Sequence, residues 1–185
     1  MRNGTTRRTW VHIVLGVLSL VAAAAGSLEA QRTASFSRAF RFAAGPSFYR
    51  FDSHTGTGVN LTLGVSHSLG RHLILDASLS DFDLLESNQS AGISGSNRTR
   101  LLMPEVDLAL QAGSGELRPF VAIGAGGAIR LDGFVQGGAT LNAAVGLRWL
   151  VGRRIDLLLE ARARTIRPFE DRMIDATVGI EVVKW

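Results

Sequence analysis

The sequence predicts an all-β protein, namely an eight-stranded antiparallel up-and-down transmembrane β-barrel preceded by a cleaved signal peptide. Three observations carry this prediction. Apolar and polar residues alternate with period two through eight segments, most of these segments exceed ten residues, and the polar face of several is built from glycine and alanine. Period two is the repeat of a strand that has one apolar and one polar face.

The first thirty residues have the order of a secretory signal. Three arginines and no acid occupy residues 1–9, an apolar run follows over residues 10–25, and small residues then lead to Ala30. The apolar run is shorter than the roughly 20 residues that a membrane-spanning helix needs. We therefore expect a signal peptide over residues 1–30, cleaved after Ala30, and one domain over residues 31–185.

Phenylalanines near the start of the domain predict the first strand, and clear alternation of apolar and polar residues predicts the next three. The alternation is plainest between Val59 and Leu69, where apolar residues at odd positions face Asn, Thr, Gly and Ser at even ones, with His67 as the only break. Similar patterns begin at Leu73 and surround Val106. The expected strands span residues 39–50, 57–69, 72–82 and 99–112.

The last four strands show the same repeat, with small residues on one face of the fifth and charged residues on one face of the seventh. These strands are expected over residues 118–131, 135–149, 154–165 and 173–185. Along the chain, short connections alternate with longer ones. Residues 70–71, 113–117 and 151–153 are short links, residues 83–98 form a long polar loop, and residues 51–56, 132–134 and 166–172 are of modest length.

Alternation alone fits a soluble barrel with an apolar core as well as a barrel in lipid. Strand length favours lipid, because soluble strands usually run about 5 to 6 residues and tilted membrane strands need about 9 to 11. The small residues of the polar face favour it too, since the interior of an eight-stranded barrel is filled by side chains and large ones need small ones opposite. These small residues are Ala43, Gly45, Gly64, Ala109, Ala122, Gly124, Gly126, Ala128, Ala144, Gly146 and Gly179.

Aromatic residues fall near both ends of the expected strands. Trp149 and Trp185 lie near the short-link end, and Phe51, Phe82 and Phe134 lie near the other end. Such positions are typical of the aromatic girdles of membrane barrels.

With these features the chain resembles the small outer-membrane β-barrel family of Gram-negative bacteria that includes the membrane domain of outer membrane protein A. The resemblance covers essentially the whole of residues 31–185. The resemblance rests on the signal, the eight alternating strands, the segment RPFVAIGAG at 118–126 and the segment VGIEVVKW at 178–185. It implies export through the periplasm to the cell outer membrane, with membrane lipid as the surroundings.

The resemblance also implies contact with the barrel-assembly machinery during biogenesis, because members of the family end in an aromatic residue that this machinery reads, preceded by apolar residues at alternate positions. Trp185 and Val183 fit that rule, whereas Glu181 and Gly179 do not. A β-bulge at Val182 and Val183 would reconcile the two registers.

If the apolar face meets lipid, seven acids and five bases fall inside the barrel. Charges taken out of water must be paired, since breaking a buried pair costs about 3 to 5 kcal/mol. We therefore expect a salt-bridge network that plugs the lumen. The alternative is a path for protons or ions through these carboxylates. The residues are Arg41, Asp76, Glu105, Asp107, Arg130, Arg148, Asp156, Glu160, Arg162, Arg164, Asp175 and Glu181.

The expected role is structural, or an interaction at the surface through the 83–98 loop, whose sequence names no ligand. A barrel enzyme acting on lipids would rest on His67 and Ser68, but neighbouring strand residues point to opposite faces. A secreted soluble barrel with an apolar ligand is the third possibility. No catalytic residue is therefore assigned.

Metal, cofactor and nucleic-acid roles have little support. Asp81, Asp83 and Glu86 could attract a cation, but they lack metal-site spacing and a solvated loop edge explains them. The chain has 20 basic and 16 acidic residues, scattered rather than in runs, and no cysteine. We expect no nucleic-acid partner, no thiolate metal site and no cofactor.

Overall fold

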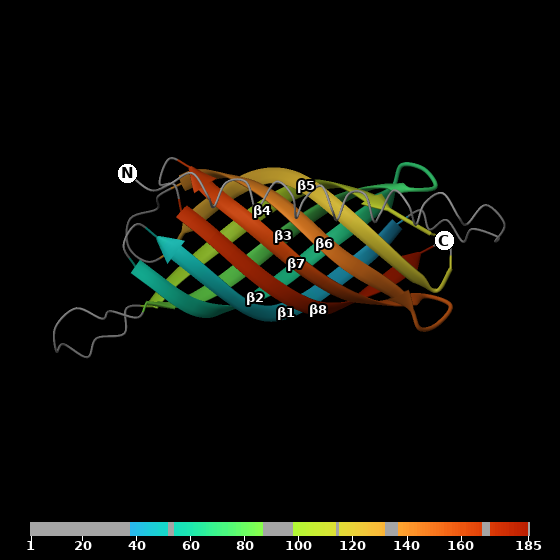
Figure 1. Ribbon diagram of the computed structural model, residues 1–185, viewed down its shortest axis with the longest axis horizontal. Helices are drawn as coiled ribbons and strands as arrows, with labels where there is room; N and C mark the ends of the chain where they lie inside the picture. Colours follow the sequence, from blue (N-terminus) through green and yellow to red (C-terminus); the bar gives the residue numbers. More distant parts are fainter. Residues whose placement is uncertain are drawn as a thin grey trace, which may run out of the picture.

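The computed structural model describes residues 38–51, 54–86, 98–113, 115–131, 137–167 and 171–184. All regular elements in these ranges are strands, and they close into one antiparallel barrel in sequence order, with the last strand paired to the first. Figure 1 shows the strands tilted around a common axis. They are β1 (Arg38–Phe51), β2 (His54–Ser68), β3 (Leu73–Glu86), β4 (Arg98–Gln111), β5 (Leu117–Arg130), β6 (Gly137–Leu150), β7 (Ile155–Arg167) and β8 (Asp171–Lys184).

The predicted fold class is confirmed, and each expected strand is present with shifted ends. The largest shift is in β3, which runs to Glu86, so that Asp83 to Glu86 are strand residues rather than the start of a loop. The alternation continues there, because Leu84 points inward and Leu85 outward. Among the described residues no helix is long and apolar enough to cross a membrane. The expected signal peptide and Phe134 lie outside the described residues.

The two ends of the barrel differ in their connections. Residues 69–72, 112–116 and 151–154 join consecutive strands at one end, called the turn end below, and two of these links lie at the right of Figure 1. Backbone hydrogen bonds close two of them, from Leu69 N to Leu73 O and from Val151 N to Ile155 O. The opposite end, which carries residues 87–97, is called the loop end.

Side chains alternate strictly between the two faces of every strand, and the outward face is the apolar one. Phe42, Leu63, Ile123, Leu141 and Val178 are examples of outward residues that are about half exposed or more. A protein surrounded by water buries such residues. This inverted arrangement, apolar outside and polar inside, is that of a barrel surrounded by lipid.

Two apolar layers lie inside the barrel, one at each end. The turn-end layer comprises Ala39, Ile74, Ala109, Phe120, Ala122, Ala144, Leu158 and Val183. The loop-end layer comprises Tyr49, Phe82, Leu84, Leu101, Met103, Ala128, Ile166 and Met173. Phe82 therefore faces inward, and its predicted place in an outer aromatic girdle is wrong, because it shares its face with Ser80. Trp149 does face outward.

Candidate functional site

The inward face of every described strand except β2 carries charged side chains, and most of them lie between the two apolar layers. Eleven of the twelve charges expected in the lumen are buried inside the barrel. They are Arg41, Asp76, Glu105, Asp107, Arg148, Asp156, Glu160, Arg162, Arg164, Asp175 and Glu181. Together with Arg118 we call this set the lumen network.

Two arginines organise the half of the lumen network nearer the turn end. Arg41 of β1 contacts Asp76 at 2.8 Å, Glu160 at 3.2 Å and Glu181 at 3.3 Å. Arg148 of β6 contacts Glu181 at 2.8 Å and Asp76 at 3.3 Å. Two acids thus each lie between two guanidinium groups, and the contacts link five strands across the barrel.

Two further arginines, both on β7, organise the other half. Arg162 contacts Asp107 at 2.6 Å, Glu160 at 2.9 Å and Glu105 at 3.3 Å. Arg164 contacts Glu105 at 2.8 Å. Because Glu160 also contacts Arg41, the two halves form one continuous set of ion pairs.

Neutral polar groups complete the half nearer the loop end. Arg164 also pairs with Asp175, and the Asn60 amide donates to the Asp175 carboxylate at 3.0 Å. The Asn142 amide donates to Glu105 at 3.1 Å. Such bonds add partners to carboxylate oxygens in a low-dielectric interior, where an unpartnered polar atom is costly.

Aromatic rings lie against two arginines of the lumen network, one in each apolar layer. The guanidinium of Arg148 lies 4.7 Å from the centre of the Phe120 ring, in the turn-end layer. The guanidinium of Arg164 lies 5.1 Å from the centre of the Phe82 ring, in the loop-end layer. Both distances suit a cation–π interaction. The charged zone is therefore in direct contact with the apolar layer on each side.

One residue of the lumen network was missed by the sequence analysis and one was misplaced. Arg118 is buried and contacts Asp156 at 2.7 Å. Its even number puts it on the same face of β5 as Ala122 and Gly124, and that parity was the available signal. Arg130 shares this face, but it lies at the end of the strand, so it is exposed and donates to the Thr99 hydroxyl at 3.3 Å.

Inward glycines provide the room that the large side chains need. A Cβ on Gly124 would lie 1.8 Å from Oδ1 of Asp107, and a Cβ on Gly146 would lie 2.4 Å from the Phe120 ring. Small residues opposite large ones were expected from the narrow interior of an eight-stranded barrel. These two contacts show which large groups the glycines accommodate.

The candidate catalytic and cation-binding residues lie on the outside or apart. His67 is exposed on the outer face of β2, whereas Ser68 lies on the inner face. Asp81 and Asp83 each form an ion pair with an arginine and do not face one another. Within the described ranges, no group of three or more His, Cys, Asp or Glu residues is placed to hold a metal ion.

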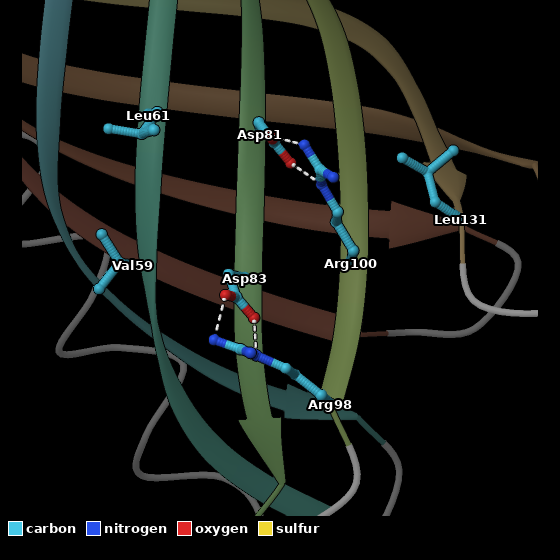
Figure 2. A pocket seen from close by; sticks show the side chains of 7 residues that line it. All are labelled: Val59, Leu61, Asp81, Asp83, Arg98, Arg100 and Leu131. Atoms are coloured by element: carbon cyan, nitrogen blue, oxygen red, sulfur yellow. Dashed lines mark hydrogen bonds and ion pairs between the residues drawn. The ribbon is translucent and has the colours of Figure 1, made fainter.

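A second set of charges lies on the outer face of β3 and β4 near the loop end. Arg100 contacts Asp81 at 2.5 Å, and Arg98 contacts Asp83 at 2.7 Å (Figure 2). We call these two ion pairs the outer ladder. They line a groove of about 550 Å³ together with Val59, Leu61 and Leu131. Both ion pairs are diagonal in the register, since Arg100 lies opposite Asp83 and Arg98 lies opposite Leu85. The two carboxylates balance the two arginines, so the outer ladder carries no net charge.

The C-terminal strand pairs with β1 without a bulge. Val183 lies opposite Ala39 and Val182 opposite Phe40, in unbroken register. Val183 is therefore buried inside the barrel, and the outward apolar residues are Ile180 and Val182. The bulge considered from the sequence is not found, so Val183 lies on the opposite face from the outward apolar set. Trp185 lies outside the described residues.

The closed barrel, its apolar exterior and its charged interior define the class of small eight-stranded membrane β-barrels. Solved structures of this class agree. Neisserial surface protein A aligns with 11% identity and a TM-score of 0.66, over 79% of this chain and 96% of that one. The outer membrane protein OprG of Pseudomonas aeruginosa aligns with 10% identity and a TM-score of 0.55, over 80% and 97%.

A third neighbour is Ail, the attachment invasion locus protein of Yersinia pestis, with 11% identity and a TM-score of 0.54 over 81% of this chain and all of that one. The predicted resemblance to small outer-membrane barrels is confirmed at the level of fold, and the predicted outer-membrane location agrees with these neighbours. No protein-family model and no curated protein matches the sequence.

Proposed function

We propose that this protein is an outer-membrane barrel with a structural or surface-interaction role, and that its lumen is plugged rather than conducting. The observation that carries the proposal is the lumen network, in which four arginines and their acids form one continuous set of ion pairs and Arg118 forms a separate pair with Asp156. Each of its five arginines contacts at least one carboxylate. An ion entering this zone would have to displace buried pairs, and breaking one costs about 3 to 5 kcal/mol.

The two apolar layers add to this support. The loop-end layer contains the fully buried Phe82, Leu84 and Met103, and the turn-end layer contains Phe120 and Leu158. An ion on the barrel axis would have to cross both layers as well as the charged zone. A charged group is expensive in such surroundings unless it finds a partner.

Conductance across a planar lipid bilayer tests the plugged lumen. The reconstituted protein is expected to leave the current at the level of a protein-free bilayer, at both polarities and in concentrated salt. Different gel migration of boiled and unboiled samples verifies that the reconstituted protein is folded. Reproducible single-channel steps from folded protein would refute the proposal and favour the ion path.

The surface role is proposed for the loop end, where residues 87–97 connect β3 and β4. Replacing residues 86–97 by a two-residue Asn-Gly turn should preserve the barrel, because Leu85 and Arg98, which would flank this turn, are already paired. Cells displaying either form can be compared for adhesion to cultured epithelial cells. Equal adhesion of the two would count against a binding role for this loop.

The other partners in this proposal are membrane lipid around the barrel and the barrel-assembly machinery during biogenesis. The proposal includes neither a nucleic-acid partner nor a catalytic role. His67 and Ser68 support no catalysis, because they lie on opposite sides of the barrel wall. Unchanged lipid composition in a lipid-hydrolysis assay with the purified protein is the expected result.

A further inference from the structure

Three arginines form a cluster on the outer face of the barrel near the loop end, on the side formed by β7, β8 and β1. Arg50 is near the end of β1, Arg172 is near the start of β8, and Arg167 is the last residue of β7. All three are exposed. The strands are neighbours in the closed sheet (Figure 1), and we call these residues the arginine cluster.

The register brings these like charges together. Arg50 lies directly opposite Arg172, and Arg172 lies opposite Thr165, two residues from Arg167. Like charges directly opposite each other destabilise a strand pair. Within the part of the chain that the structure describes, none of the three has an ion pair, in contrast to the arginines of the outer ladder. The arginine cluster therefore places three arginines without ion pairs among the described residues on neighbouring strands of the outer face.

The surface changes from charged to apolar directly below the arginine cluster. Phe48 precedes Arg50 on the outer face of β1, and Ile174 follows Arg172 on the outer face of β8. Phe48 and Ile174 lie opposite each other in the register. Positive charge at the end of the barrel and apolar surface toward its middle match an amphiphile that has an anionic headgroup and hydrocarbon chains.

We propose that the arginine cluster binds the phosphate groups of a phosphorylated lipid in the leaflet on the loop side, with the lipid's acyl chains lying over Phe48 and Ile174. Guanidinium groups suit this ligand, because their planar fork of donors matches phosphate oxygens. A bound phosphate also removes the repulsion between Arg50 and Arg172. This inference goes beyond the proposed function and does not depend on whether the lumen is plugged.

The outer ladder supplies a matched control. It lies at the same end of the barrel, it also contains exposed arginines, and it too faces outward, but Asp81 and Asp83 neutralise it. The variant Asp83→Asn/Arg98→Gln removes one of its ion pairs and leaves the net charge of the protein unchanged. If the lipid binds at the arginine cluster, this control variant should therefore bind it with the affinity of the wild type.

Native mass spectrometry of the folded protein in a nonionic detergent, titrated with diphosphorylated lipid A, tests the proposal. The triple variant Arg50→Gln/Arg167→Gln/Arg172→Gln should bind this lipid about a hundredfold more weakly, since each arginine near an anionic headgroup contributes about fivefold. The triple Lys variant retains the charge and should recover most of the affinity. Phosphatidylcholine should bind all forms alike.

Gel migration of unboiled samples verifies folding of every variant, and all substitutions lie outside the lumen network. Wild-type affinity in the triple Gln variant would overturn the proposal, as would an equal loss in the outer-ladder control. Pyrophosphate that binds as tightly as lipid A would assign the arginine cluster to soluble polyanions and overturn the lipid assignment. We expect that only the triple Gln variant loses affinity, and that it loses affinity only for the phosphorylated lipid.

Discussion

At the scale of single residues, the interior of the barrel depends on matching each large side chain to a small one. The ring of Phe120 extends into the space that a side chain on Gly146 would occupy, and Arg148 stacks on the same ring. Protein interiors are close-packed, so an added methyl group there displaces backbone or ring.

Gly146→Ala is therefore expected to destabilise the barrel by about 1 to 3 kcal/mol. Its Cβ would lie 2.4 Å from the Phe120 ring and 2.5 Å from the carbonyl oxygen of Leu159. Gly64→Ala is the control, because its nearest neighbour, the carbonyl oxygen of Ala77, is 3.1 Å away. Urea unfolding in lipid vesicles, followed by tryptophan fluorescence, measures both. A larger effect at Gly64 would contradict the explanation.

The Arg118 and Asp156 pair provides a second test at this scale. Arg118→Met leaves Asp156 buried without its partner and should cost about 3 to 5 kcal/mol. The double variant Arg118→Met/Asp156→Asn removes both charges and should recover most of that loss. By contrast, Arg98→Met breaks an exposed pair of the outer ladder, where the cost should stay below about 1 kcal/mol. Equal costs for Arg118→Met and Arg98→Met would show that burial is irrelevant.

At the scale of elements, each strand has two faces with opposite requirements. On β8, Glu181 and Asp175 join the lumen network, while Val178 and Ile180 between them face outward. The outward residues meet lipid only if the barrel is in a membrane, and the effect of a charge there depends on depth.

Val178→Arg, at the middle of β8, is expected to destabilise the protein by about 2 to 4 kcal/mol in a bilayer. The same change at Thr57, an outward residue near the loop end of β2, should cost about 0 to 1 kcal/mol. Equilibrium unfolding in vesicles measures both. Equal costs at the two positions would argue against a lipid-facing outer surface.

At the scale of the whole molecule, closure between β1 and β8 leaves no strand edge unpaired in the described barrel. Open edges and unpaired backbone groups are not tolerated in hydrocarbon, so closure is a requirement of the membrane location. It also places acids and arginines from opposite sides of the barrel within reach of one another, as for Arg162 of β7 and Asp107 of β4.

Closure predicts a simple behaviour of the intact protein. An unboiled sample in detergent should migrate differently from a boiled one, because the closed barrel resists dodecyl sulfate until heat opens it. Circular dichroism of the unboiled sample should show β-structure. A single band that does not change on boiling, together with solubility in plain buffer, would be incompatible with a membrane barrel.

The sequence by itself determined the eight strands, their direction of alternation and most of the residues of the lumen. This was possible because the two faces of a strand follow from parity, which is a local property. Arg118 and Phe82 could have been placed inside by the same rule, since both share a face with small residues. Both lie at the end of an expected strand, 118–131 for Arg118 and 72–82 for Phe82, where a charged or aromatic side chain can also face the membrane interface.

The tertiary structure alone decided which charges meet. Arg162 contacts Asp107 across the barrel and Glu160 on its own strand, and Arg41 contacts acids on three other strands. These pairings depend on strand tilt, register and side-chain length, which no local pattern contains. For the same reason, only the closed sheet reveals that Arg50 lies opposite Arg172, residues separated by most of the chain and brought together where β8 meets β1.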